Sequence, residues 1–237
     1  MAAGPITLYN AFETNLAQGA HSLLTDTIVA VLLGTGYVPN VPTDGTWANL
    51  SANELATGGG YTQGGIVLTS PTLLYYAATG LVSPLTTIIA GGSGYAATST
   101  FNLTIVGGTG TAAVISVTTN GSGVVITVNS ITTAGSYSVL PGNPAAVTGG
   151  TGTGCTLAVK WGLAFNAAAV SWASATITVK YLALVRRAAG ALAGTDKIIG
   201  YSDQNTGGGT VSSTNAAYSD TWQAAAGPVP AGLLTLS

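Results

Sequence analysis

The residues of this sequence that could act as nucleophile, base or acid are few and scattered. The chain of 237 residues has one histidine, one cysteine and seven acidic residues. His21, Ser22 and Asp26 contain the three residue types of a hydrolytic triad, but close neighbours in sequence rarely adopt the geometry that a triad needs. We therefore expect His21 to be an ordinary, partly exposed histidine that follows a helix.

The other reactive groups give no catalytic pattern. Cys155 lies in a predicted strand without a nearby base, which indicates a buried and unreactive thiol. A glycosidase needs two carboxyl groups roughly 5–10 Å apart, and the acids form no obvious pair. One histidine cannot make a two-histidine metal site, while Asp203 and Asn205 fit a weak calcium site or a simple turn equally well. The sequence predicts no enzyme, no metal and no cofactor.

Charge is nearly absent from this chain. Charged residues make up 5%, against about 25% in an average globular domain, and residues 55–159 contain no Asp, Glu, Lys, Arg or His. Arg186-Arg187 is the only basic cluster, which argues against nucleic-acid binding. The apolar runs are too short to cross a membrane. Because so few charges protect a monomer weakly against association, we expect a homo-oligomer, a dimer or a trimer.

The hydrophobic pattern predicts mostly strands. Asn10 and Glu13 resemble a capping box for a short helix over 10–18, which Gly19 would end. The strands expected outside the middle of the chain cover 26–33, 64–76 (two strands around Pro71), 175–185, 196–203, 216–224 and 232–237. Trp172 and Trp222 lie in these patterns and are expected in the core. The predicted fold is mainly β: an antiparallel β-sandwich or jelly-roll-like domain with one short N-terminal helix and an inserted small all-β module.

The middle of the chain contains an internal duplication. GGTGTAAVISV at 107–117 returns as GGTGTGCTLAV at 149–159, and Gly94-Tyr95 returns as Ser136-Tyr137 at the same spacing. Neither glycine run has the lysine of a phosphate-binding loop, and strands rather than helices follow. The glycines are therefore interpreted as turn and packing residues. Asn120-Gly121 predicts a hairpin. We expect residues 85–160 to form the inserted module and 1–84 plus 161–237 the parent domain.

Three stretches of the parent domain resemble a known family. DTIVAVLLGTGYVPNVPTDGTWANLSANELATGGGYTQGGIVLT (26–69), AAAVSWASATITVKYLALV and the closing GLLTLS are similar to virion proteins of tailed bacteriophages, specifically capsid decoration (cement or head-fibre) proteins. The duplicated module resembles GGSGY…GGTGTGA units of phage fibre and tail proteins. The loop at 186–197, RRAAGALAGTDK, departs from the family pattern because it is longer and basic, which puts its contact in doubt.

The resemblance implies a non-enzymatic protein on the capsid exterior of a virion. Its partners would be the major capsid protein and further copies of itself, with no nucleic acid and no membrane. Tyr37 and Trp47 are the expected apolar contacts with a partner. One alternative is a tail or fibre component that contacts host surface glycans, and another is a free carbohydrate-binding β-sandwich or a glycan hydrolase.

Overall fold

The computed structural model describes residues 4–77, 86–220 and 234–236 of the chain. The protein is mainly β, with 52% strand, 7% helical residues and antiparallel sheets, which confirms the predicted fold class. Two compact units are present: unit 1 comprises Met1–Thr72 and Ala167–Trp222, and unit 2 comprises Leu73–Asn166 and Gln223–Ser237. Each unit is discontinuous in sequence, and the predicted boundaries after residues 84 and 160 differ from those of the units.

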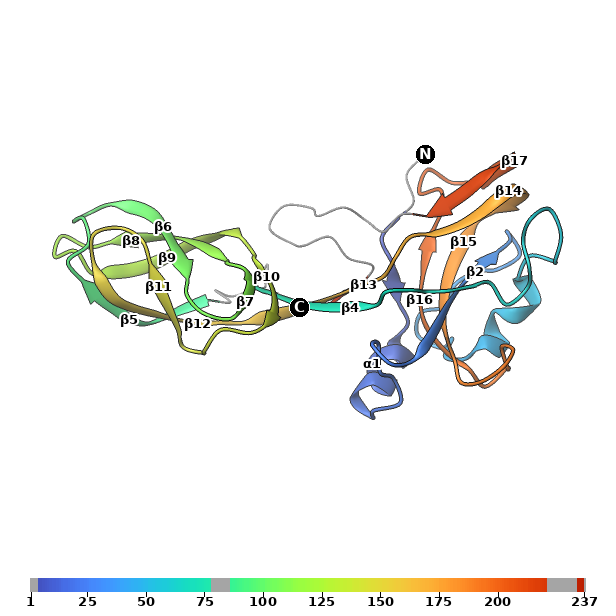
Figure 1. Cartoon of the computed structure of the whole chain (residues 1–237), viewed down its shortest axis with the longest axis horizontal. Coiled ribbons are helices and arrows are strands. Elements are labelled where there is room, and N and C mark those ends of the chain that lie inside the picture. Colours follow the sequence, from blue (N-terminus) through green and yellow to red (C-terminus); the bar gives the residue numbers. More distant parts are fainter. Residues whose placement is uncertain (1–3, 78–85, 221–233, 237) are drawn as a thin grey trace. The chain divides into compact units, whose positions relative to one another are not determined.

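Unit 1 is built on a five-stranded antiparallel sheet (Figure 1). Its strands are, in spatial order, β1 (Thr7–Leu8), β16 (Lys197–Asp203), β15 (Tyr181–Arg187), β2 (Thr27–Leu33) and β3 (Ile66–Val67). Six of the seven residues of β2 are buried, because this strand lies inside the sheet and is covered on both faces. An uninterrupted apolar run is what such a position requires.

One helix and two short 3-10 turns complete this part of unit 1. The helix α1 (Asn10–Ala17) buries Phe12, and Gly19 adopts a left-handed φ of 70° just after the helix, as predicted. The capping box does not form, since Tyr9 is the N-cap residue and no side chain caps it. The turns η1 (Trp47–Asn49) and η2 (Ser51–Asn53) follow β2.

The predicted strand over 175–185 is two strands. Among the described strands, β14 (Val170–Val179) pairs with β17 (Val211–Asp220) alone, whereas β15 begins at Tyr181 in the main sheet. Burial alternates along most of β14, with Ile177 and Val179 inside, but Leu182 and Ala183 of β15 are both buried. The alternation ends where the chain enters the interior of the sheet.

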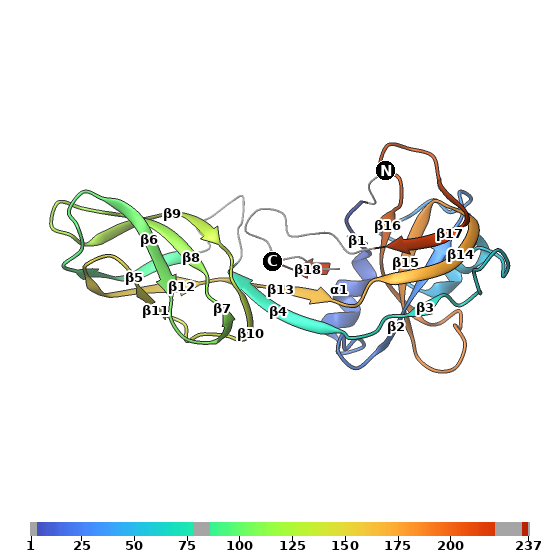
Figure 2. The same ribbon diagram turned by 45° about the horizontal axis from the view of Figure 1, so that its top comes forward.

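Unit 2 contains a curled six-stranded sheet, here called the barrel (Figure 2). Its strands are, in spatial order, β5 (Thr86–Ser93), β12 (Thr153–Val159), β11 (Ala145–Thr148), β6 (Thr100–Ile105), β8 (Val114–Thr119) and β9 (Val125–Thr133). The two outermost strands, β5 and β9, approach each other closely. A side chain at Gly91 of β5 would overlap the carbonyl of Val125 in β9, so glycine is needed where the sheet curls onto itself.

The duplication is visible in the pairing of the barrel strands. Leu103 of β6 pairs with Ile115 of β8, and the residues one repeat later, Ala145 and Leu157, pair in the same way. Ile105 pairs with its own counterpart, Val147. Antiparallel pairing of a residue with its counterpart places a local two-fold axis between the two hairpins.

The outer strands exchange between the two copies of the repeat. Val117 of the first copy pairs with Val128 of the second, and their counterparts Val159 and Thr86 pair across the other side of the barrel. Each copy therefore places its first strand beside the last strand of the other copy. Neither copy could close the barrel without the other.

The predicted hairpin forms, but its turn is longer than two residues. β8 and β9 pair as expected, and the connection between them runs from residue 120 to 124. The Asn120 side chain accepts hydrogen bonds from the backbone N–H groups of Ser122 and Val124, and Gly123, not Gly121, has a positive φ. A second sheet of unit 2 contains β18 (Leu234–Leu236), β13 (Trp161–Asn166), β4 (Thr72–Ala77), β10 (Ser136–Val139) and β7 (Thr109–Thr111).

No helix among the residues described here is long and apolar enough to cross a membrane.

Candidate functional site

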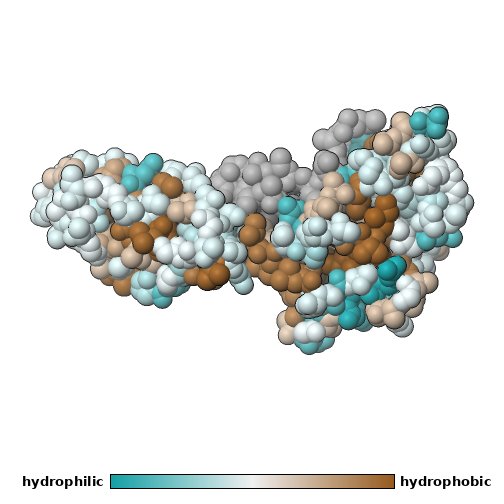
Figure 3. Space-filling view, in the orientation of Figure 1, coloured by the Kyte–Doolittle hydropathy of each residue, from teal (hydrophilic) through white to brown (hydrophobic). Residues whose placement is uncertain are grey.

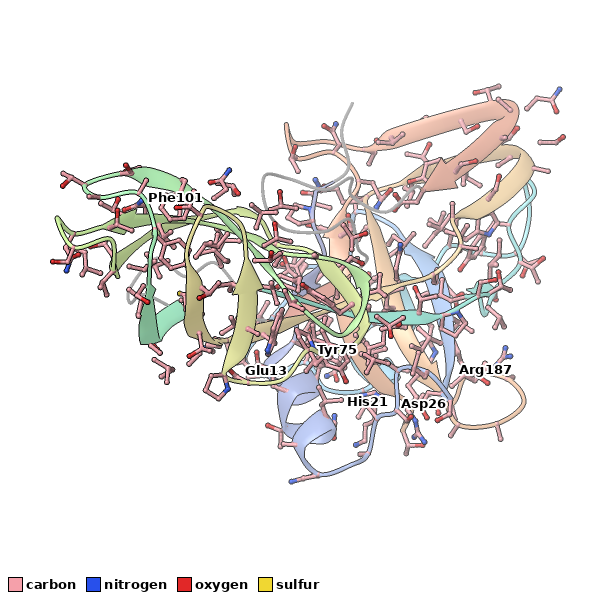
Figure 4. All side chains as sticks on the ribbon, turned by 60° about the vertical axis from the view of Figure 1, so that its left-hand side comes forward. Glu13, His21, Asp26, Tyr75, Phe101 and Arg187 are labelled. Atoms are coloured by element: carbon pink, nitrogen blue, oxygen red, sulfur yellow. The ribbon has the colours of Figure 1, made fainter. Side chains whose placement is uncertain are left out.

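The histidine of the proposed triad lies beside its acid, but not beside its serine. His21 Nδ1 is 3.6 Å from Asp26 Oδ2, which also lies 3.0 Å from Arg186 Nε (Figure 4 labels His21 and Asp26). The Ser22 hydroxyl accepts a hydrogen bond from Thr25 Oγ1, and the Ser22 backbone N–H donates to Asp26. Asp26 thus holds the turn after α1 together, and no nucleophile is activated.

The prediction that His21 is partly exposed is wrong. Its side chain is fully buried against Phe12, with ring centroids 5.2 Å apart, and neither ring nitrogen makes a hydrogen bond with the described residues. Burial lowers the pKa of His21, because the charged imidazolium would lose its hydration, while Asp26 acts in the opposite direction. The residue is a neutral core histidine at neutral pH.

The acidic residues of unit 1 hold its loops rather than forming a catalytic pair. Glu54 Oε1 accepts hydrogen bonds from Tyr61 Oη and from the Gly64 N–H. Asp196 accepts two backbone N–H groups, from Ala188 and Ala193. Six acidic side chains receive hydrogen bonds within the unit: Asp26, Asp44, Glu54, Asp196, Asp203 and Asp220.

The basic loop of residues 186–197 is likewise held by a carboxylate that accepts hydrogen bonds from backbone N–H groups. Asp196 fixes both ends of its central part, and Arg186 at its beginning pairs with Asp26. Half of the Arg186-Arg187 pair is therefore engaged inside unit 1. The buried Asp196 carboxylate therefore stabilises the conformation of this loop.

Tyr37 and Trp47, the predicted partner contacts, lie in the core of unit 1. Their exposed fractions are 4% and 5%, so neither side chain offers a surface anchor. The Tyr37 hydroxyl donates to Asp44 Oδ2 over 2.6 Å and shares a second hydrogen bond with the Tyr9 hydroxyl. The sequence misleads here because a Pro- and Gly-rich loop indicates exposure, yet it folds back onto the sheet. Among the exposed residues of this loop, Val38 is the large apolar one, and 80% of its surface is exposed.

Four tyrosines of unit 1 form a closed ring of contacts that the sequence does not reveal. Tyr9 packs against Tyr201, Tyr201 against Tyr181, and Tyr181 against Tyr37, with centroids 5.5, 5.7 and 5.8 Å apart. The Tyr9–Tyr37 hydrogen bond of 2.6 Å closes the ring. These residues come from four separate segments, and only the register of β15 on β16 brings them together. No spacing in the sequence carries that information.

The remaining candidates are structural. Cys155 is buried, as predicted, and burial raises the pKa of its thiol, which disfavours the reactive thiolate. Trp172 is buried, as predicted, whereas Trp222 lies outside the described residues. Lys180 Nζ donates to both oxygens of Asp203 at 2.8 Å, and the Asn205 N–H donates to Asp203 Oδ1. The ammonium stands where a calcium ion would have to bind, so the turn interpretation holds.

The two glycine runs confirm the packing interpretation. A side chain at Gly110 would overlap the carbonyl of Ser136, and one at Gly152 would overlap the ring of Tyr95. The Tyr137 hydroxyl accepts the buried N–H of Ala113 at 2.7 Å, and Tyr95 is hydrogen-bonded in the equivalent way to the backbone of Cys155. Each run makes room for a tyrosine segment of the other copy.

The structure thus defines a mainly β protein of two units, in which the described residues contain no cluster of three or more metal-ligating side chains. No family model matches the sequence, and no curated protein and no solved structure matches the chain.

Proposed function

We propose that this chain is a non-enzymatic structural protein of a tailed-bacteriophage virion, most specifically a capsid decoration (cement or head-fibre) protein. Unit 1 would bind the head shell and other copies of the chain, and unit 2 would extend away from the shell. The resemblance of residues 26–69 to such proteins supports the phage assignment. The use of six of the seven acids as intramolecular acceptors is the observation that supports a structural role most directly.

The surface of the barrel supports the same proposal. On the face seen in Figure 3, unit 2 is mostly pale, with brown patches and little teal, because hydroxyl, glycine and aliphatic residues cover it. Ile89, Ile126 and Val139 are each more than half exposed. Contacts made by such a surface lack ionic terms, so salt would weaken them little. A protein on the outside of a particle benefits from that insensitivity.

The loop between β2 and η1 is the best candidate for the contact with the shell. Tyr37 and Trp47 fix this loop to the core, and Val38 stands out from it with 80% of its surface exposed. A rigid backbone that presents an apolar side chain loses little conformational freedom on binding. We therefore move the anchor role from Tyr37 and Trp47 to Val38.

Rebinding to particles stripped of this protein tests the proposal. Val38→Asp should lower the affinity for the particles roughly thirtyfold, the effect of about 2 kcal/mol at a central contact. The control is Leu24→Asp, which alters a side chain that is 48% exposed at another place in unit 1. Equal occupancy of the two variants would contradict the role of the loop. Labelling of tails instead of heads in electron micrographs would favour the tail-fibre alternative.

A further inference from the structure

Unit 1 has a groove beside the loop proposed to contact the shell, and Pro39 of that loop lies at its edge. Its cavity volume is about 260 Å³, and it lies over one end of the main sheet, where β1, β16 and β15 meet. Its wall and floor include Pro5, Thr7, Pro39, Tyr181, Tyr201 and Asp203. The volume is close to the lower end of the range of small-molecule sites, roughly 300 Å³.

Strand register places the polar and aromatic residues of the groove together. Tyr181 pairs directly with Asp203, and Tyr201 lies two residues before Asp203 on the same face of β16. Thr7 of β1 pairs with Tyr201 on the other side. A row of hydroxyl, aromatic and carboxylate groups thus crosses three strands.

The aromatic walls are rigid and form a corner. The rings of Tyr181 and Tyr201 meet at 84°, and each is backed by a buried tyrosine, Tyr37 and Tyr9 respectively. The hydroxyls of Tyr9 and Tyr37 are hydrogen-bonded to each other, and that of Tyr37 also donates to Asp44. The hydroxyls of Tyr181 and Tyr201, by contrast, make no hydrogen bond with the described residues. Each wall therefore offers a phenol without a protein partner, on a ring that is only partly buried.

The hydrogen-bond acceptor in the groove, Asp203, is held in place, and Lys180 neutralises its charge. Asp203 is held by both hydrogen bonds of Lys180 and by the N–H of Asn205, yet its side chain keeps 32% of its surface exposed. Oδ1 accepts two of these bonds and Oδ2 accepts one, so a lone pair of Oδ2 is left for another donor. The Lys180 ammonium lies 5.3 Å from the centre of the Tyr181 ring, which opposes a cationic ligand, and Asp203 opposes an anionic one.

We propose that this groove binds one ring of a neutral saccharide. The C–H face of a pyranose packs on one tyrosine, while its hydroxyls donate to Asp203 and exchange hydrogen bonds with the phenols of Tyr181 and Tyr201. The proposed saccharide contacts involve neither Val38 nor the barrel. The saccharide proposal can therefore be tested independently of the proposed decoration role.

The test is an NMR titration of the full-length, ¹⁵N-labelled protein with maltotriose, cellotriose and triacetylchitotriose. At least one should bind with a dissociation constant near 1 mM, as expected for a small open site with about 4 kcal/mol of binding free energy. Shifts should centre on Tyr181, Tyr201 and Asp203. Choline, glucuronate and a proline-rich peptide are the competing probes. Stronger binding of any of these, or no binding of all three saccharides, would overturn the proposal.

Two variants separate recognition from folding. Tyr201→Ala should weaken saccharide binding at least tenfold, and Tyr181→Phe, which removes only a hydroxyl, roughly threefold to tenfold, as for one lost hydrogen bond. Tyr75→Phe, at a half-buried tyrosine of unit 2, is the control and should bind normally. Tyr181→Phe should also keep the wild-type melting temperature. Unchanged affinity in a correctly folded Tyr181→Phe and Tyr201→Ala would exclude the groove.

Discussion

Unit 1 and the barrel of unit 2 stabilise their loops with opposite chemistry. In unit 1, carboxylates accept hydrogen bonds from backbone N–H groups and tyrosine hydroxyls, as Asp44, Glu54 and Asp196 do. In the barrel and the adjoining strands β7 and β10 of unit 2, residues 86–159 include no charged side chain. There, glycines let strands approach, and the Tyr137 hydroxyl accepts the N–H of Ala113. A buried backbone N–H needs a partner in either case.

The two ways of satisfying buried N–H groups have different disadvantages. A carboxylate gives a strong hydrogen bond but must be desolvated, and its effect depends on pH and salt. The glycine–tyrosine solution is independent of both, yet it tolerates no added atom at its contact points. We therefore expect the barrel to be sensitive to steric changes and unit 1 to be sensitive to changes of protonation.

The largest effect should come from a steric change in unit 2. Gly110→Ala places a Cβ against the carbonyl of Ser136 at a φ of 137°, where side chains are strained. We expect unit 2 to lose more than about 3 kcal/mol of stability, read from native-state hydrogen exchange in β8 and β10 of the full chain. The matched control is Gly121→Ala, because nothing lies within 4 Å of a Cβ there. Similar losses in the two variants would refute the packing role of Gly110.

Removal of one tyrosine hydroxyl from each unit should show that hydrogen bonds to carboxylates contribute more stability than hydrogen bonds between neutral groups. Tyr61→Phe leaves the Glu54 carboxylate and the Leu32 N–H without their shared partner, so we expect a loss of roughly 1.5–3 kcal/mol, as for bonds to charged groups. Tyr137→Phe removes only the bond from Ala113, and we expect about 1 kcal/mol. Chemical denaturation followed by residue-resolved exchange gives both values. A larger loss at Tyr137 would reverse the comparison.

Acidification should weaken unit 1 and spare the barrel. Burial lowers the pKa of His21 below its unfolded value of 6.5, against the attraction of Asp26, while Arg186 and Lys197 lower it further. The unfolded chain then binds the proton first, so stability is complete above about pH 6.5 and falls as the pH drops toward the folded pKa, by at most about 1.4 kcal/mol per pH unit.

His21→Leu isolates that contribution, since the chain has no other histidine. Between about pH 7.5 and 5.5, the window of histidine titration, this variant should lose the downward slope of unit 1. Asp220, whose pKa burial raises, contributes in the opposite direction. An unaltered slope in His21→Leu, or an equal slope for the barrel amides, would disprove the assignment.

Salt should have the smallest effect. Unit 1 contains the Lys180–Asp203 pair, whose side chains are 14% and 32% exposed, and such pairs contribute less than about 1 kcal/mol. Raising NaCl to 1 M, where the Debye length is about 3 Å, should shift unit 1 by a few tenths of a kcal/mol at most and leave exchange in the barrel unchanged. A barrel that responds more strongly than unit 1 would mean that charges outside it determine its stability.

The sequence predicts local elements of this protein well and their partners poorly. Alternation in β14, the apolar run of β2 and the hairpin at Asn120 follow from residues a few positions apart. The break between β14 and β15 at Lys180 cannot be predicted from nearby residues, because it arises only where the chain changes from one sheet partner to another. The burial of His21, Tyr37 and Trp47 was missed for a related reason: a polar or proline-rich segment is exposed only if nothing folds over it, and that depends on distant strands.

The exchange of strands between the two repeats also determines the order in which the barrel can form during synthesis. β6 and β8 are close in sequence, with only the short β7 between them, and can pair as soon as both have left the ribosome. β5, although it is made first, must wait for β12, since Thr86 pairs with Val159 near the end of the second repeat. Such distant pairing slows folding. The first strand of the barrel is thus the last to find its hydrogen-bonding partner. Until nearly the whole module has been translated, the backbone groups of β5 that pair with β12 remain unpaired in the nascent chain.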